Sequence, residues 1–167
     1  PLEETLEALG ELVKQGKVRQ IGLSNETPWG TMKYLELAET KSLPRVASIQ
    51  NAYNLVNRGF EIGLSEVAMH EQVGLLAYSP LAQGTLTGKY LGGQMPQGSR
   101  LALFGDGPLM MRYKGDKTQQ AIEMYVNLAK KYEVDPAQLA IQFCNIQPFV
   151  TSTIIGATTM EQLKTCI

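Results

Sequence analysis

Four short apolar runs of the sequence each end in polar or small residues that could contact a ligand. These ends are Ser24-Asn25, Gln50-Asn51, Tyr78-Ser79 and Gly156-Ala157-Thr158. In parallel β/α folds the ligand lies beyond the carboxyl ends of the strands. If the four runs are strands of one sheet, their ends form a single ligand-binding rim. Polar residues also end strands that bind nothing, so the prediction depends on all four ends together.

The standard phosphate-binding motifs are absent. No G-x-G-x-x-G fingerprint occurs, and Gly84 to Lys89 is one residue short of the G-x-x-x-x-G-K spacing. Tyr90 also stands where that motif needs a serine or threonine to hold magnesium. A glycine-bearing loop with a lysine can still approach a phosphate through its backbone N–H groups.

The remaining reactive side chains form no recognisable catalytic or metal-binding set. His70 is the single histidine, and Cys144 and Cys166 lack both metal-ligand and C-x-x-C spacing. We expect His70 at the surface or at a helix end, Cys144 in the core, and Trp29 packed at a helix start. The sequence therefore predicts no catalytic residue and no metal site, and its cysteines indicate a reducing compartment.

Charge and hydropathy argue against two classes of partner. Fifteen Lys and Arg residues balance sixteen Asp and Glu residues, and a net charge of −1 indicates neither nucleic acid nor an anionic membrane as the partner. The uncharged run from Pro136 to Met160 contains glutamines, an asparagine and a second proline. We interpret it as a helix followed by a buried strand rather than a membrane span.

Helices and strands alternate along the chain. Apolar spacing predicts helices at 2–15, 27–39, 61–72, 117–132 and 136–146, and one that begins at Thr159. Short apolar runs predict strands at 19–25, 46–51, 75–79 and 153–156, and glycine-rich residues 81–115 predict a long loop. This order favours a parallel α/β sheet with right-handed crossovers. A doubly wound sheet and a (β/α)₈ barrel both fit the pattern.

Four strands are fewer than a closed barrel needs, and the chain begins and ends within predicted helices. We therefore expect residues 1–167 to be a piece of a larger protein. A half-length product would instead have open sheet edges, through which it could associate with a copy of itself.

Five stretches around the predicted strand ends carry a family resemblance. They are residues 16–19 (GKVR), 21–25 (IGLSN), 49–54 (IQNAYN), 77–90 (AYSPLAQGTLTGKY) and 155–163 (IGATTMEQL). In this order and spacing they resemble the aldo-keto reductase family over nearly the whole chain. The resemblance is strongest to its Tas-like branch, which is related to the potassium-channel β subunits.

The resemblance implies a (β/α)₈ TIM-barrel fold of which this chain covers roughly strands 5–8. Residues 1–167 would be the C-terminal, NADP(H)-binding half, with the N-terminal half and the final helices absent. The family's catalytic Asp, Tyr, Lys and His all belong to the first half, before Pro1, so this chain would carry the cofactor site without the acid–base groups. The implied activity of the parent protein is NADPH-dependent reduction of aldehydes or ketones to alcohols.

The resemblance assigns the nicotinamide end of the cofactor to the first three strand ends. Ser24, Asn25 and Gln50 match residues that hold the carboxamide, whose donors and acceptor need polar partners. Tyr78 matches the aromatic residue on which the nicotinamide ring stacks.

The phosphates are assigned to the turn and loop that follow the third strand. Ser79, Leu81 and Gly84 match the pyrophosphate-binding turn. Lys89 and Arg100 match basic residues that clamp phosphates. Arg100 is the better candidate for a 2′-phosphate, because its planar guanidinium can bind it with two donors.

The adenosine 2′-phosphate end is assigned to the start of the last helix. Gly156, Thr158 and Gln162 match that site, and a helix N-terminus favours an anion. Thr165 and Cys166 depart from the family, which often has a carboxylate and an amide facing the adenine there. The departure leaves the preference for NADPH over NADH open.

Two other functions remain open from the sequence. The chain could be a non-catalytic nucleotide-binding or accessory module, or a truncated, inactive half-barrel. The expected partner is a small carbonyl compound, with neither nucleic acid nor membrane. The expected location is the cytoplasm, or an organelle if a transit peptide precedes residue 1.

Overall fold

The computed structural model describes residues 1–105 and 107–167; Asp106, in the loop predicted at 81–115, lies outside the described residues. One parallel sheet has the strand order β1-β2-β3-β4. Its strands are β1 (Gly22–Ser24), β2 (Ser48–Ala52), β3 (Gly74–Tyr78) and β4 (Val150–Thr153). Because neighbouring strands are parallel, their carboxyl ends lie at the same end of the sheet, as the predicted rim requires.

Helices follow the strands, and local capping explains where several begin. They are α1 (Leu2–Lys14), α2 (Pro28–Thr40), α3 (Leu64–Glu71), α6 (Asp116–Lys131), α7 (Pro136–Asn145) and α8 (Met160–Cys166). Thr27 Oγ1 accepts the Gly30 N–H at 3.1 Å at the start of α2, and Asp135 Oδ1 accepts the Ala137 N–H at 2.7 Å at the start of α7. The predicted helix at 61–72 is shorter, because Gly63, with a φ of 99°, separates a 3₁₀ turn (Gly59–Glu61) from α3.

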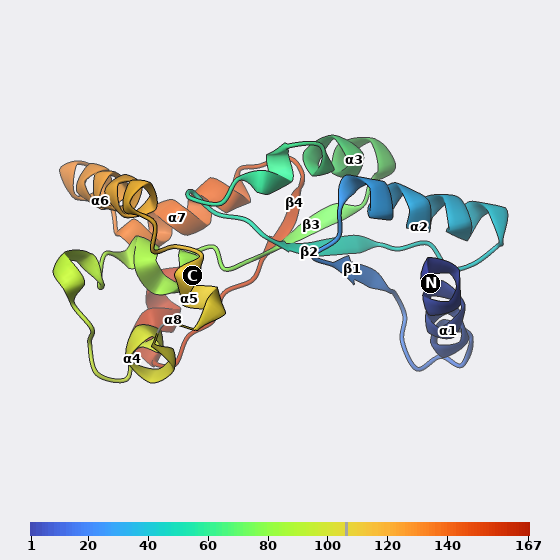
Figure 1. Cartoon of the computed structure of the whole chain (residues 1–167), viewed down its shortest axis with the longest axis horizontal. Coiled ribbons are helices and arrows are strands. Elements are labelled where there is room, and N and C mark those ends of the chain that lie inside the picture. Colours follow the sequence, from blue (N-terminus) through green and yellow to red (C-terminus); the bar gives the residue numbers. More distant parts are fainter. Residues whose placement is uncertain (106) are drawn as a thin grey trace.

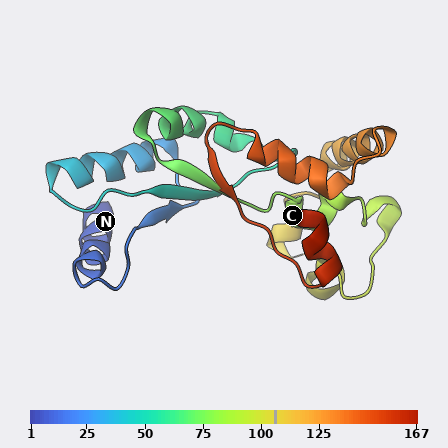
Figure 2. The same cartoon turned by 180° about the vertical axis from the view of Figure 1, so that it is seen from behind.

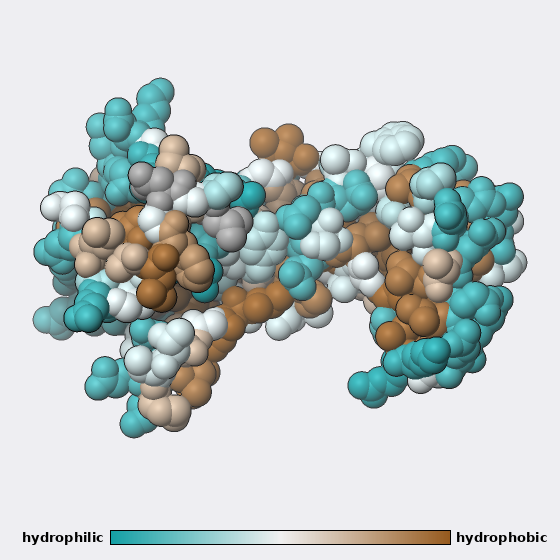
Figure 3. Space-filling view, turned by 60° about the horizontal axis from the view of Figure 1, so that its bottom comes forward, coloured by the Kyte–Doolittle hydropathy of each residue, from teal (hydrophilic) through white to brown (hydrophobic). Residues whose placement is uncertain are grey.

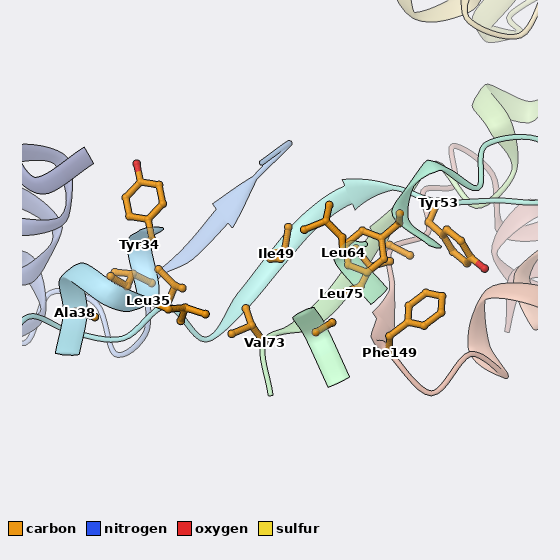
Figure 4. Close-up of a cluster of buried hydrophobic side chains, with 14 of the residues drawn as sticks. Tyr34, Leu35, Ala38, Ile49, Tyr53, Leu64, Val73, Leu75 and Phe149 are labelled. Carbon is orange, nitrogen blue, oxygen red and sulfur yellow. The ribbon is translucent and has the colours of Figure 1, made fainter. Parts of the chain in front are cut away.

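The helices cover one face of the sheet. Figures 1 and 2 show α2 and α3 along that face and α7 beyond β4. Ile49 and Leu75 are fully buried against these helices, and Leu35 and Phe149 are buried in the same cluster (Figure 4). Ala77 of β3 is also fully buried. Side chains alternate between the faces of a strand, so the residues between these positions, such as Gln50, face the other side. Among the described residues no helix covers that second face.

The uncovered face is largely uncharged. Ser24 pairs in register with Gln50, Gln50 with Leu76, and Leu76 with Ser152. In Figure 3 apolar side chains are exposed along the middle of the molecule, and hydrophilic ones gather toward its two outer ends.

The first and fourth strands are placed differently from their predictions. The fourth is predicted at 153–156, but β4 begins where Val150 pairs with Leu75. The Ile154 N–H still donates to the Ala77 carbonyl at 2.8 Å, and β3 ends one residue later, so the next residues have no strand to pair with. Pairing also limits β1 to three of the seven residues predicted at 19–25.

Residues 81–115, predicted as a long loop from their glycine and proline content, contain several short helical turns. They contain 3₁₀ turns at Ala82–Thr87 and Leu91–Gly93 and the short helices α4 (Arg100–Phe104) and α5 (Pro108–Met111). Leu86 and Tyr113 are buried in a second core cluster with Ile122 and Val126 of α6. This long segment lies at the carboxyl end of the sheet, on the same side of the molecule as α6 and α8 (Figures 1 and 2).

Candidate functional site

Side chains from the carboxyl ends of β1 and β3 form a hydrogen-bonded row. The Tyr78 hydroxyl donates to Asn25 Oδ1 at 2.8 Å, and Asn25 Nδ2 donates to Ser24 Oγ at 3.1 Å. Gln50 of β2 pairs in register with Ser24, and its carbonyl accepts the Asn25 N–H at 3.0 Å. The structure therefore brings together the four residues predicted for the first part of the rim, although Asn25 and Tyr78 are 53 positions apart.

The backbone at two strand ends adopts the left-handed conformation. The φ angle is 54° at both Asn25 and Ser79. This conformation costs roughly 1–2 kcal/mol for an ordinary side chain, and asparagine tolerates it better than most. Such strain persists where the surroundings hold it, and it is frequent at functional sites. At Ser79 the carbonyl accepts a hydrogen bond from Asn54 Nδ2 at 2.9 Å.

Asn54 is fully buried, and its side chain joins three parts of the site. Nδ2 donates to the Ser79 carbonyl and to the Tyr113 hydroxyl, at 2.9 and 3.1 Å, and Oδ1 accepts the Val56 N–H at 3.0 Å. Asn54 follows β2, Ser79 follows β3, and Tyr113 lies near the end of the long segment. We call Asn54, Ser79 and Tyr113 the Asn54 clamp, because they fix both ends of the long segment on one side chain.

Gln83 links the Arg100 guanidinium to the turn after β3 by hydrogen bonds. Gln83 Nε2 donates to Ser79 Oγ at 2.8 Å, and Gln83 Oε1 accepts a hydrogen bond from the Arg100 guanidinium. Arg100 is exposed and has further donors for a ligand. Sequence reasoning missed Gln83, because neither its residue type nor its spacing distinguishes it from a surface glutamine.

Lys89 lies against the same turn. The Gly84 N–H donates to the Leu81 carbonyl at 2.8 Å, and Gly84 has a φ of 92°. A Cβ at this position would lie 3.0 Å from Lys89 Nζ, so glycine allows the ammonium group to approach the backbone of the turn. Nζ also lies 5.1 Å from the centroid of the Tyr90 ring. Lys89 and Arg100, both predicted to contact phosphates, therefore lie at one turn.

Arg112 is a residue of this region that sequence reasoning missed. Its Nη1 donates to the Tyr78 hydroxyl at 3.4 Å, and this hydrogen bond is the main cause of the raised pKa of the guanidinium. Arg112 caps the C-terminus of α5 and precedes Tyr113 of the Asn54 clamp. The pattern gave no signal for it, since 34 positions separate it from Tyr78.

The residues after β4 form a separate hydrogen-bonded group. Gln162 Oε1 accepts the Thr158 N–H at 2.9 Å and its hydroxyl at 3.1 Å. Thr159 Oγ1 accepts the Gln162 N–H at 3.2 Å, which confirms the predicted helix start. In a complete capping box the Gln162 side chain would accept the Thr159 N–H, but here it accepts the Thr158 N–H instead. Gly156 is exposed. This group lies at the end of the molecule that holds the long segment (Figure 2).

Thr165 and Cys166, where the sequence departs from the family, face α7. With Leu139 and Gln142 they line an open hollow of about 390 Å³. Partial burial raises the pKa of the Cys166 thiol.

The other reactive side chains lie away from the rim. His70 is exposed in the last turn of α3, and Cys144 is fully buried, both as expected. Burial raises the pKa of the Cys144 thiol to about 12. The sequence predicts that Trp29 packs at a helix start, and this prediction is wrong. It lies at the start of α2, but its side chain is 72% exposed and points away from the core. Within residues 1–105 and 107–167, no three His, Cys, Asp or Glu side chains gather as metal ligands. In the same residues, each helix is too short or too polar to span a bilayer.

Comparison with known proteins identifies the family. The model of the aldo/keto reductase family matches residues 1–167. The chain belongs to the aldo/keto reductase family. It is 54% identical to Protein tas of Escherichia coli (strain K12), over 99% of this chain and 47% of that protein. It is 35% identical to L-glyceraldehyde 3-phosphate reductase of the same strain (98% and 48%) and 33% identical to a probable voltage-gated potassium channel subunit beta of Oryza sativa subsp. japonica (98% and 50%).

Family membership confirms both the resemblance and the fold class expected from it. The family fold is a (β/α)₈ barrel, and four parallel strands with helices on one face agree with a partial barrel. The uncovered face of the sheet then corresponds to the barrel interior. The chain spans about half the length of the curated relatives it matches.

Proposed function

We propose that this chain is the C-terminal, NADP(H)-binding half of an oxidoreductase that reduces aldehydes or ketones to alcohols. The observation that carries the proposal is the row formed by Ser24, Asn25 and Tyr78 at the carboxyl end of the sheet, in a chain of this family. Lys89 and Arg100 at the adjoining turn add the positive charge that phosphates require.

The groups on the rim suit the nicotinamide end of such a cofactor. Its carboxamide needs donors and an acceptor, which the exposed Ser24, Asn25 and Gln50 side chains offer. Its ring needs an aromatic face, which Tyr78 offers. Bound NADPH supplies the hydride, and the residues of this chain bind the cofactor and orient one face of its ring.

The remaining predicted contacts extend the site toward the phosphates and the adenosine. Ser79, Leu81 and Gly84 form the turn whose backbone would approach the pyrophosphate. Gly156, Thr158 and Gln162 would contact the 2′-phosphate end.

A fluorescence titration tests the proposed cofactor site. NADPH emission is expected to change saturably as the 167-residue chain is added, and no change at high micromolar protein would refute the site. Adenosine 2′,5′-bisphosphate, which lacks the nicotinamide, should compete for the same site.

Turnover by the complete protein tests the proposed activity. It should oxidise NADPH with a small aldehyde, and L-glyceraldehyde 3-phosphate is a first choice because one relative is named for it. The 167-residue chain alone should bind NADPH without turnover, since the family resemblance assigns the acid–base residues to the half of the barrel that residues 1–167 do not include. NADPH binding without turnover in the complete protein would favour the alternative of a non-catalytic nucleotide-binding or accessory module.

We also propose that the isolated chain self-associates through its open sheet edges. β1 and β4 are the outer strands of the sheet, and one edge of each pairs with no other strand of the described residues. Light scattering that detects only monomer would refute this. The two free cysteines suit a reducing compartment, and the cytoplasm is the location we propose, to be tested by imaging the tagged protein.

A further inference from the structure

A guanidinium group stands at one end of the hydrogen-bonded row on the rim. Arg112 Nη1 donates to the Tyr78 hydroxyl at 3.4 Å, that hydroxyl donates to Asn25 Oδ1 at 2.8 Å, and Asn25 Nδ2 donates to Ser24 Oγ at 3.1 Å. An arginine side chain only donates hydrogen bonds. The Tyr78 oxygen must therefore accept from Arg112, and its own proton is free to point at Asn25.

This direction of donation fixes the orientation of the Asn25 amide. Its oxygen faces Tyr78, so its NH₂ group lies on the side of Ser24. One N–H is used by Ser24 Oγ, and the other is available to a ligand at this exposed position. If the hydroxyl proton of Tyr78 turned elsewhere, the amide could rotate and present its oxygen instead.

The fold fixes Arg112 where it can act on Tyr78. The next residue, Tyr113, is 1% exposed and belongs to the Asn54 clamp. Arg45 and Arg58 form ion pairs with glutamates, whereas no ion pair of the described residues includes Arg112. The groups that act on its guanidinium are the hydroxyls of Tyr78 and Tyr113.

We propose that Arg112 is a positioning residue for the nicotinamide end of the cofactor site. It sets the proton of the Tyr78 hydroxyl, which holds the Asn25 amide so that an N–H faces the carboxamide oxygen of the nicotinamide. This inference rests on the proposed function. It adds a residue that would not contact the cofactor itself and acts through the edge of the stacking ring.

Binding measurements on four variants test this role. Tyr78→Phe keeps the ring and removes the hydroxyl, and Arg112→Ala removes the donor to it. Each should weaken NADPH binding by about three- to tenfold, the usual effect of one lost hydrogen bond. The double variant should bind NADPH no more weakly than Tyr78→Phe alone, because Arg112 acts only through the hydroxyl. Arg112→Lys should recover part of the affinity, because an ammonium group can also donate to Tyr78.

Adenosine 2′,5′-bisphosphate separates this role from a general effect on the loop. Its affinity should be unchanged in all four variants, and Arg45→Ala should alter the affinity for neither ligand. Arg45 is a matched control because it precedes β2, at the amino end of the strands, and pairs with Glu71. The inference is overturned if Arg112→Ala weakens both ligands equally, or if it acts with full effect in the Tyr78→Phe background. Failure of the unmodified chain to bind either ligand would refute the proposed function, and this inference with it.

Discussion

Replacement of Asn54 by alanine is expected to lower the free energy of unfolding by about 2–4 kcal/mol. The side chain makes three hydrogen bonds, to the Ser79 carbonyl, the Tyr113 hydroxyl and the Val56 N–H, at 2.9, 3.1 and 3.0 Å. Each such bond contributes about 1 kcal/mol net. Tyr113 is 1% exposed, so water cannot readily replace the lost Asn54 donor, and this loss adds to the cost.

Urea unfolding measures this loss, and Asn57→Ala is the matched control. Asn57 is half-buried and faces Asn54 across a bridge of two backbone hydrogen bonds, both 3.1 Å, which alanine preserves. The control should change the free energy of unfolding by no more than about 0.5 kcal/mol. Equal losses in Asn54→Ala and Asn57→Ala would refute the clamp, because the side-chain bonds would then contribute nothing beyond the local turn.

A second pair of variants separates the hydrogen bonds of the clamp from the loss of side-chain volume. Tyr113→Phe removes one bond and keeps the ring, so it should cost about 1 kcal/mol. In the Asn54→Ala background the same change should cost less, since its partner is already gone. Full additivity of the two losses would mean that Asn54 and Tyr113 do not interact in solution.

Three further predictions concern the site and the core. Arg100→Ala should weaken NADPH binding more than NADH binding in fluorescence titrations, because a guanidinium binds a 2′-phosphate with two donors; equal losses would remove Arg100 from that site. Gly84→Ala should destabilise the chain by at least about 1 kcal/mol in urea, because its φ is 92° and the new Cβ would lie 3.0 Å from Lys89 Nζ; Gly92→Ala, with a φ of 68° and open space around it, isolates the steric part. Burial raises the pKa of the Cys144 thiol to about 12, above roughly 8.5 for a free thiol. The stability that the protonated thiol contributes is therefore fully present below about pH 8.5 and is lost as the pH rises toward about 12. The free energy of unfolding of Cys144→Ala should therefore fall less steeply over this range than that of the unmodified chain, and parallel curves would contradict the assignment.

The part of the site that could be predicted from the sequence depends on residues that adjoin along the chain. Asn25 and Tyr78 each follow an apolar run directly, and parallel pairing then brings such strand ends together whatever their separation. Thr27 and Asp135 cap the helices that they precede, as their residue types indicate.

The part that could not be predicted depends on contacts between distant residues. Asn54 and Tyr113 are 59 positions apart, and Arg112 reaches Tyr78 across 34. The sequence separation of neither pair indicates a contact. The path of the long segment depends instead on where Leu86 and Tyr113 are buried in the second core cluster. The start of β4 is likewise set by pairing with β3, which the composition of residues 150–156 does not reveal.

The Asn54 clamp has a consequence for how this protein can vary. The entropic cost of closing a loop whose ends are fixed grows slowly with its length, by about 0.6 kcal/mol for each doubling. Residues 92–98 are exposed between the clamped ends, so a glycine–serine insertion there should change the free energy of unfolding by less than that amount. New sequence can therefore enter the long segment and face whatever molecule approaches, while Arg112 keeps its place beside Tyr78. One buried amide thus separates the part of the rim that can diversify from the part that must stay fixed.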